Sequence, residues 1–462
     1  MVLKFNKDKA ANVLLIAFLV LIFFGKILRI GLVLFYPAII CAFVAICLGD
    51  NNFRVGTCLM LVPNIRVFDG LQISFIINVL IALPVFAYIL ETKRINFTAL
   101  MHVLIIGTWD LMHSLAFNQA NQILANLSTV IILYYVECVL TDSAVKLNYS
   151  EIARKFSFGC LYSGLVFMLY MALFGSMPLF TYISLWRLSG FAGDPNYYSL
   201  YVCVAIAMLF IIAEKHKIRD YIYLFTMIGI TLLTASKMSL VTILIILIYF
   251  VFRSLYGILS ASNRFARRVV LIGAVLGAIF SGRIVDSINN TLIRLQEKNG
   301  DTIDIDTITS NRYMIQSFYT NEIFTHPMLL LFGYGLQYNE TDIYKGFQHI
   351  AHNTYLDVIL SWGLVGVVIL FAVFFRIVKM MNKNRLERLT VNHFLPMIVT
   401  GVTFFALSCL SATMFWWIIC AALLPLKGLY SDETAYILHR SRLQRRKFHF
   451  NVHGVAHGAN VS

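Results

Sequence analysis

Four segments of the chain hold polar residues whose types and spacing could bind an anion and move a proton. Their ionisable members are Arg187, Lys237, Arg312 and His352. An arginine presents a planar fork of donors that matches a phosphate, and a lysine presents a point charge. A histidine can act as a general base near neutral pH. These residue types are those that a site for a phosphorylated substrate needs.

The first segment, WRLSGFAGDPNYYSLY at residues 186–201, joins an arginine to a helix start. Asp194 and Pro195 are typical of an N-cap and of the first helical position, so Asp194 has a structural role, and Asn196 follows it. Arg187 falls on the outer side of the membrane in the topology given below, where arginine is disfavoured without a partner. That partner is a phosphate, a lipid headgroup or an acidic loop residue.

The second and third segments supply two further cations. TASKMSL at 234–240 is the tip of a hairpin of two spans, where Lys237 either holds an anionic group or extends to the interface as snorkelling lysines do. Arg312 stands on the first turn of an expected helix at 310–324, with Ser310 as its N-cap. The helix dipole disfavours a cation there, which indicates an anionic partner, either a ligand or an acid such as Glu322.

Two turn motifs follow Arg312 in the third segment. They are His326-Pro327 and Gly333-Tyr334-Gly335. Proline and glycine are typical turn residues, and the glycines permit close approach of another backbone.

The fourth segment, HNTYLDVILSWGLVG at 352–366, begins where a long polar loop re-enters the membrane. His352 and Asn353 open it, and Gly363 and Gly366 further on are small residues suited to tight helix packing. A single histidine is more often structural than catalytic, so spacing alone leaves both roles open for His352.

Acidic residues elsewhere in the sequence give weaker indications of a functional site. Asp301, Asp304 and Asp306 lack the ligand order and the glycine of a calcium loop, and we interpret them as a solvated acidic loop. Asp110 and Glu137 lie inside or near apolar runs, where charge is costly, so they are functional candidates without an identifiable partner.

These residues lie in a chain with the composition of a polytopic membrane protein. Of its 462 residues 59% are hydrophobic and 13% are charged, against roughly a quarter charged in soluble proteins. This composition excludes a soluble, a collagen-like or a disordered protein. The formal charge of +14 fits basic cytoplasmic loops better than nucleic-acid binding. The eight cysteines fall in apolar runs and are expected to be packing residues.

The predicted fold class is all-α, with about fourteen transmembrane spans and one large extracytoplasmic loop. The apolar runs lie near 11–24, 31–48, 54–68, 72–90, 97–113, 121–140, 156–176, 197–213, 220–235, 238–253, 269–281, 355–375, 394–410 and 412–427. The run 54–68 contains Pro63 and Arg66 and is the weakest, so twelve to fourteen spans are compatible with the pattern. Fourteen keep Lys4 and the pair Lys93-Arg94 on one face.

The same rule predicts both termini in the cytoplasm and divides the chain into four parts. Transmembrane helices occupy 1–281, the extracytoplasmic loop 282–352, further helices 353–430, and a basic cytoplasmic tail 431–462, disordered after Lys447. Amphipathic runs at 284–296 and 310–324 indicate that the loop folds as short helices lying over the membrane domain.

Taken together, the four segments resemble the O-antigen polymerase and O-antigen ligase superfamily of bacterial envelope proteins. The resemblance covers 186–366. It rests on the arginine followed by Ser-Gly-Phe and Asp-Pro-Asn, the Ser-Lys hairpin, the Asn-Arg, His-Pro and Gly-Tyr-Gly motifs, and His352-Asn353 with Leu356, Gly363 and Gly366. The chain before residue 186 is similar only in being hydrophobic spans. Lys237 departs from the arginine more common in the family.

The resemblance implies a metal-independent, inverting glycosyltransferase of the GT-C type without a cofactor. It implies a glycan donor on undecaprenyl diphosphate at the outer leaflet of the bacterial plasma (inner) membrane. Arg187, Arg312 and Lys237 would bind the diphosphate, and His352 would be the catalytic base. The supporting residues would be Asp194, Asn196, His326, Gly333, Gly335 and Asn353. No metal ligand is implied.

The resemblance favours a polysaccharide polymerase over the alternatives. A ligase would transfer the finished polymer to lipid A core or another acceptor, and a shape-and-division peptidoglycan glycosyltransferase is a further alternative. A lipid-linked oligosaccharide flippase, a transporter, should show two related halves around a midplane cavity. Expected partners are the undecaprenyl-diphosphate-linked oligosaccharide, the lipid bilayer and a chain-length regulator in the membrane, but no nucleic acid. The product is O-antigen, capsule or exopolysaccharide.

Overall fold

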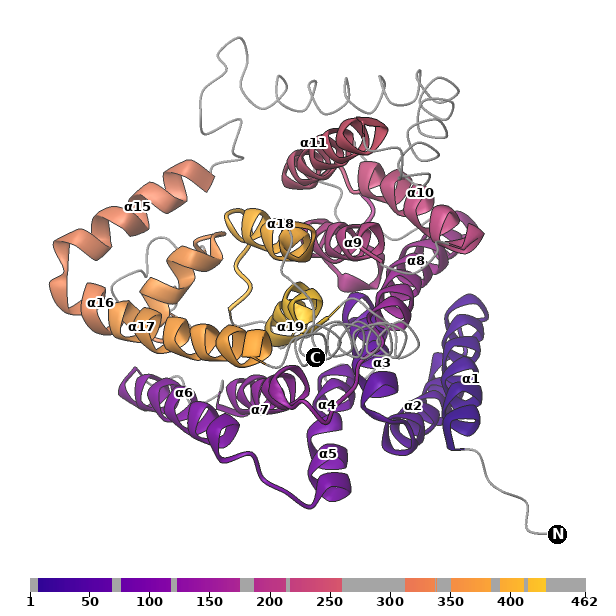
Figure 1. Cartoon of the computed structure of the whole chain (residues 1–462), viewed down its shortest axis with the longest axis horizontal. Coiled ribbons are helices and arrows are strands. Elements are labelled where there is room, and N and C mark those ends of the chain that lie inside the picture. Colours follow the sequence, from indigo (N-terminus) through magenta and orange to yellow (C-terminus); the bar gives the residue numbers. More distant parts are fainter. Residues whose placement is uncertain are drawn as a thin grey trace, which may run out of the picture.

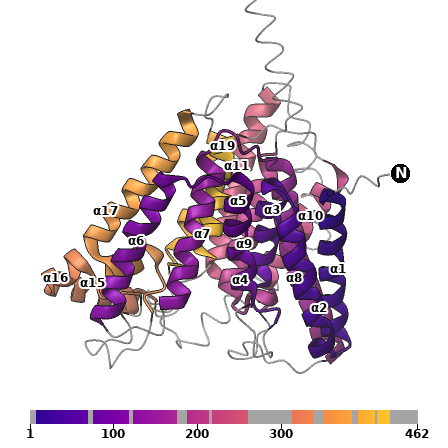
Figure 2. The same cartoon turned by 90° about the horizontal axis from the view of Figure 1, so that it is seen from below.

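The structure is a computed structural model in which every regular element of the described residues is a helix, as the sequence predicts. Figure 1 views the helices roughly end-on and Figure 2 views them from the side. The described residues are 7–68, 76–117, 123–174, 187–212, 217–259, 312–336, 338, 350–383, 391–410 and 414–428. The predictions for 269–281, 284–296, Asp301, Asp304, Asp306, Ser310 and the tail lie outside these residues.

Four helices in the described part of the chain are long and apolar enough to cross a membrane. They are α1 (Lys7–Ile27), α6 (Phe97–Ala116), α8 (Tyr149–Phe174) and α17 (Thr354–Lys383). Further helices lie in other predicted spans: α2 (Gly31–Leu48), α7 (Ile123–Thr141), α9 (Pro195–Phe210), α10 (Ile218–Leu233), α11 (Lys237–Leu259), α18 (Leu395–Phe404) and α19 (Phe415–Lys427). Fourteen crossings and their orientation stay predictions.

Two of the expected spans are broken into shorter pieces. The run 54–68 forms α3 (Asn51–Leu61) and one turn of 3-10 helix, Val62–Asn64. The run 72–90 contains α4 (Ile76–Ala82) and α5 (Pro84–Thr92), separated at Leu83. Each interruption lies at a proline. A proline breaks the helix there because it lacks the backbone N–H that a helix interior requires.

Two later spans also differ from the predicted regular helices. The run 394–410 leaves the helix at Phe404, and 405–410 continues as turns and irregular backbone to the gap before α19. Within α17 the backbone at Gly363 is not helical, with φ 66° and ψ −173°. Both irregular places prove important because a helix interior uses its own carbonyls, whereas irregular backbone offers them to other elements.

Helix α9 lies near the centre of the bundle. It packs against α8, α10, α11, α18 and α19, and all its residues from Tyr198 to Phe210 are buried. Figure 1 shows α1 and α2 together at one edge, and α17 beside α6 at another. The start of α9 is therefore surrounded by elements that are far apart in the sequence.

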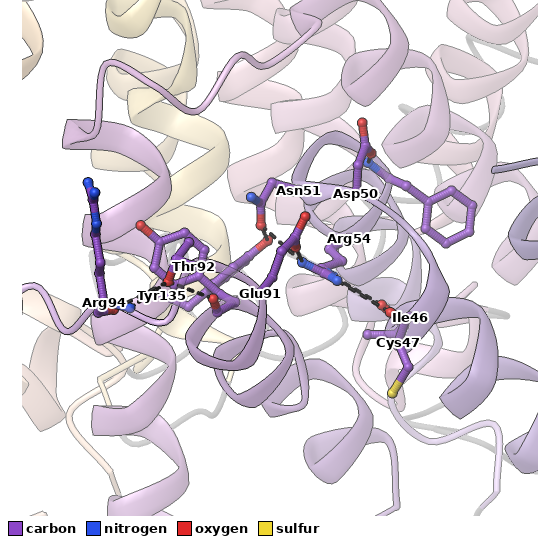
Figure 3. A network of polar contacts seen from close by, with 11 residues as sticks. Ile46, Cys47, Asp50, Asn51, Arg54, Glu91, Thr92, Arg94 and Tyr135 are labelled. Carbon is purple, nitrogen blue, oxygen red and sulfur yellow. Dashed lines mark hydrogen bonds and ion pairs between the residues drawn. The ribbon is translucent and has the colours of Figure 1, made fainter. Parts of the chain in front are cut away.

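Polar contacts gather at one end of the bundle around Arg54, which is 3% exposed. Its Nη1 donates to Glu91 Oε2 at 2.5 Å and its Nε donates to the Ile46 carbonyl at 3.1 Å. Asn51 Oδ1 accepts a hydrogen bond from the Tyr135 hydroxyl at 3.1 Å. Figure 3 shows these side chains converging from α2, α3, α5 and α7. They tie four helix ends into one layer.

The two ends of α10 show that the bundle has two distinct polar faces. Near its start, Asp220 accepts two hydrogen bonds from Arg154, from Nε at 2.9 Å and from Nη2 at 3.0 Å. At its other end, Leu233 and Thr234 contact the segment that carries Arg187. The face of Arg54 and Asp220 corresponds to the predicted cytoplasmic side, and the face of Arg187 to the predicted outer side.

Candidate functional site

The predicted cap of α9 is present in the structure. Asp194 Oδ1 accepts hydrogen bonds from the backbone N–H groups of Asn196 at 2.7 Å and Tyr197 at 3.2 Å. Pro195 occupies the first helical position. This local arrangement sets where α9 begins.

Arg187 joins the first two sequence segments. Its Nε donates to the Thr234 carbonyl at 3.0 Å and its Nη2 donates to Asn196 Oδ1 at 3.1 Å. The neighbouring N–H of Leu188 donates to the Leu233 carbonyl at 3.0 Å. Lys237 is the first residue of α11 and follows Thr234 by three residues, so it adjoins the turn that Arg187 bonds.

Arg312 is the first residue of α15 (Arg312–Thr325), a helix much later in the chain than Arg187. Its Nη1 donates to the Ala406 carbonyl at 2.7 Å. Burial lowers the pKa of Arg312, and the nearby negative charge of Asp194 acts in the opposite direction. Glu322 forms its ion pair with His326 instead, at 3.3 Å. The acid that acts electrostatically on Arg312 is therefore Asp194, the cap of α9.

Four consecutive carbonyls, of residues 405–408, connect these elements. We call this segment the 405–408 linker. In chain order its carbonyls accept hydrogen bonds from the side chains of Gln316 (3.5 Å), Arg312 (2.7 Å), Thr354 (2.5 Å) and Tyr197. The donors come from α15, α17 and α9. Because α18 ends at Phe404, these carbonyls can serve other elements, and the sequence interpretation missed this role by assigning them to a helix.

His352 lies close to the linker through its backbone. Its carbonyl accepts a hydrogen bond from Gln316 Nε2 at 3.4 Å, and its φ of 51° lies in the left-handed region. Asn353 caps α17, with its Oδ1 accepting from the N–H groups of Tyr355 at 3.0 Å and Leu356 at 3.2 Å. Gln316 stands one helical turn after Arg312, so α15 brings His352 and Arg312 to the same part of the bundle.

A buried acid, Asp357, stands beside this region and was not among the predicted residues. It is 4% exposed, and its Oδ1 accepts hydrogen bonds from the Tyr338 hydroxyl at 2.5 Å and from Ser408 Oγ at 3.1 Å. The sequence could have indicated Asp357 as an acidic residue on the first turn of an apolar helix. In the structure, Asp357 ties the start of α17 to the 405–408 linker.

Three predicted supporting residues are not brought to this region. His326 lies beyond the far end of α15, a helix of 14 residues, about 20 Å from Arg312. Gly333 and Gly335 lie against the break in α17. There the N–H groups of Tyr334 and Gly335 donate to the carbonyls of Leu360 at 2.7 Å and Ser361 at 2.8 Å.

The close backbone approach predicted for Gly333 is confirmed. A Cβ atom there would lie 2.5 Å from the carbonyl carbon of Ser361, and one at Gly363 would lie 2.2 Å from the Leu331 carbonyl oxygen. The two glycines therefore allow two backbones to cross. Gly366 is also tightly packed, with Trp109 Nε1 3.3 Å from the position of an added Cβ.

The two acids expected in apolar surroundings have partners in the structure. Glu137 Oε2 lies 2.8 Å from His102 Nδ1 between α6 and α7. Asp110 Oδ1 accepts a hydrogen bond from Trp362 Nε1 at 3.2 Å. Both pairs join α6 to a neighbouring helix, which is a structural role.

The structure thus assembles what we call the cationic cluster, namely Arg187, Asp194, Lys237, Arg312 and His352. No protein-family model matches this chain, and no curated protein matches it. The arrangement of the cluster is therefore the basis for a function. It brings the guanidinium groups of Arg187 and Arg312 near the capped start of a central helix, with the first residue of α11, Lys237, and the backbone of His352 in adjoining elements.

Proposed function

We propose that the protein is a polysaccharide polymerase of the bacterial plasma membrane, with both termini cytoplasmic and a GT-C-like architecture. It would transfer a glycan from undecaprenyl diphosphate to a growing lipid-linked glycan at the outer leaflet. The supporting observation is that residues from all four sequence segments meet around the start of α9 and the 405–408 linker.

The proposed reaction needs positive charge where the diphosphate departs. Arg187 and Arg312 approach the start of α9 from different elements, the first through Asn196 and the second near Asp194. An arginine stays protonated even where burial lowers its pKa. Charges held in place by protein hydrogen bonds need little reorganisation when the leaving group becomes more negative. Lys237 would add a third cation from the neighbouring turn.

The reaction also needs a base for the acceptor sugar, and this is the role proposed for His352. Its imidazole would take the proton of the attacking hydroxyl. The hydroxyl oxygen would form a bond to the anomeric carbon of the donor as the bond from that carbon to the diphosphate oxygen breaks. Attack from the opposite side inverts the anomeric centre. The capped start of α17 and the contact with Gln316 would hold the backbone of this base.

The remaining supporting residues would act at a distance from the reacting atoms. Asp194 and Asn196 position α9 and Arg187, and Asn353 positions α17. Gly333 and Gly335 hold the turn at 333–336 against α17, and no metal or cofactor enters the proposed reaction.

Deletion of the gene followed by electrophoresis of the surface glycolipids tests this proposal. Loss of a polymerase leaves a single repeat unit where a ladder stood. Loss of a ligase leaves no attached unit, and loss of a flippase leaves units on the inner leaflet. These outcomes separate the three alternatives.

Alanine variants of Arg187, Arg312 and His352 test the site. At normal protein level each should reproduce the single repeat unit of the deletion. Arg376→Ala is the matched control, because Arg376 is exposed and bonds Thr98 far from the cluster. Normal ladders in all three cluster variants would refute the catalytic assignment.

A further inference from the structure

We propose that α15, α16 (Pro327–Phe332) and the following turn at 333–336 form a hairpin embedded in the outer leaflet, where its exposed face contacts lipid hydrocarbon. The sequence suggested instead that these helices lie over the membrane domain. This inference depends on the membrane placement of α6 and α17, but not on the proposed transferase activity.

The depth of the hairpin carries the first part of the argument. The turn bonds to α17 at Leu360 and Ser361, which lie six and seven residues after the start of α17 at Thr354. At 1.5 Å per residue this is about 10 Å along the helix. A segment bonded there lies beside the first half of a membrane-spanning helix.

A second contact joins α16 to the last turn of α6. The Phe332 carbonyl lies 2.5 Å from His113 Nε2, on the last turn of α6. Figure 2 shows α15 and α16 beside the end of α6 and not beyond it. The hairpin thus extends the helix bundle sideways at the level of the outer leaflet.

The exposed surface of the hairpin has the chemistry of a lipid-facing surface. No exposed side chain of α15 or α16 is Asp, Glu, Lys or Arg. The exposed residues include Phe324 (74% exposed) and Met328 (68% exposed), with Leu331 and Phe332 beside them, and the uncharged polar residues Thr320, Asn321 and Thr325. In water, an exposed helical hairpin of this size would normally carry charges.

The exposed histidine between these two helices, which can carry a charge, is already paired. His326 lies 3.3 Å from the carboxylate of Glu322. Pairing reduces the cost of placing such groups near hydrocarbon. Arg312, at the other end of α15, bonds the linker near the start of α17, which is the level expected for lipid headgroups.

An apolar pocket continues this surface towards α6. It has a volume of about 340 Å³ and lies between α16 and the end of α6. Its lining is mostly apolar and aromatic, with Phe117, Pro327, Met328, Leu329, Phe332 and Tyr334, and it also includes Gly333 and His326. On α6, Met112 and Leu115 are also exposed. A large apolar pocket that adjoins a lipid-facing helix is suited to a hydrocarbon chain.

Fluorescence quenching in vesicles tests the location of the hairpin. A cysteine replaces Phe324 or Met328 and carries an environment-sensitive fluorophore, with Cys41 and Cys47 changed to serine because the other native cysteines are buried. The protein is placed in phosphatidylcholine vesicles that contain lipids with a nitroxide on the acyl chain. Phe371→Cys on α17 is the lipid reference, and Ser143→Cys is the water reference.

The expected result is a blue-shifted emission at 324 and 328, strong quenching by the nitroxide lipids and loss of quenching by iodide, as at 371. Emission and iodide quenching like those at 143 would overturn the proposal. A photo-reactive residue at 328, in the chain with its native cysteines, gives a second measurement. It should form adducts with phospholipid acyl chains, whereas the same residue at 143 should not, and an absence of lipid adducts at 328 would also overturn the proposal.

The vesicles contain no glycan, so the outcome is independent of transferase activity. If the ladder test fails while the lipid contact is found, the proposed function is wrong and the embedded hairpin stands. If the ladder test succeeds while 324 and 328 face water, the reverse holds.

Discussion

Replacing Gly363 by alanine should destabilise the protein strongly, because two features of the structure oppose a side chain there. The backbone has φ 66° and ψ −173°, a region that is essentially restricted to glycine. The added Cβ would also lie 2.2 Å from the Leu331 carbonyl oxygen and 2.4 Å from the Phe332 nitrogen. These are backbone atoms and cannot turn away as a flexible side chain does.

The magnitude follows from these two features. A non-glycine residue in such a conformation costs about 1–3 kcal/mol. Forcing extra volume between packed elements costs about 1–3 kcal/mol more. The sum, about 2–6 kcal/mol, is a large part of the roughly 5–15 kcal/mol that stabilises a typical folded domain. If the backbone moves to relieve the clash, the two hydrogen bonds from Tyr334 and Gly335 to α17 weaken.

Thermal unfolding followed by a thiol-reactive fluorogenic dye is a suitable assay. Six native cysteines are buried and react only after unfolding: Cys58, Cys138, Cys160, Cys203, Cys409 and Cys420. We expect a clearly lower unfolding midpoint for Gly363→Ala. Gly333→Ala should behave in the same way, because its Cβ would meet the facing backbone at Ser361.

Gly229→Ala is the matched control. Gly229 lies inside α10, and nothing lies within 4 Å of an added Cβ. Alanine is about 0.5–1 kcal/mol more favourable than glycine in a helix, so this variant should melt at or above the midpoint of the native protein. Our reasoning about the crossing of the two backbones would be refuted if Gly363→Ala unfolded at the same temperature as Gly229→Ala.

Three further predictions concern other contacts. Asp220→Asn should lose about 3–5 kcal/mol of stability, since it leaves the buried Arg154 without its carboxylate; an unchanged midpoint in the dye assay would contradict this. Asn353→Ala should lose about 1 kcal/mol and shorten the glycan ladder, whereas Asn353→Asp, which keeps the cap, should restore both. In intact cells, a membrane-impermeant thiol reagent should label Ile350→Cys and leave Ser143→Cys unlabelled, and the opposite pattern would invert the topology.

Much of the local structure could be predicted because it depends on neighbours in the chain. The start of α9 follows from Asp194 and Pro195. The hydrogen bonds that Asp194 accepts reach only two or three residues along the chain. The helix expected at 310–324 is present as α15 (Arg312–Thr325), whereas its predicted cap, Ser310, lies outside the described residues. The close approach at Gly333 was also expected, although the sequence could not show which backbone it meets.

The cluster itself could be predicted only in part. The types of residue at 187, 237, 312 and 352 indicated anion binding and proton transfer. The 405–408 linker, which accepts a hydrogen bond from Arg312, was assigned to a regular span because its surroundings are apolar. The small polar residues Ser408, Ser411 and Thr413 were a signal that α18 ends early.

By itself, the sequence determined the helical, apolar class of the protein, the cap of α9 and the kind of chemistry that its charged residues can do. These depend on composition and on interactions within a few residues. Only the tertiary structure decided that Arg312 bonds a carbonyl 94 residues away, that α17 breaks at Gly363, and that the hairpin of α15 and α16 lies beside the spans. Such contacts depend on which backbone N–H and carbonyl groups are not already hydrogen-bonded within their own helix. A local sequence pattern does not show which distant groups these are.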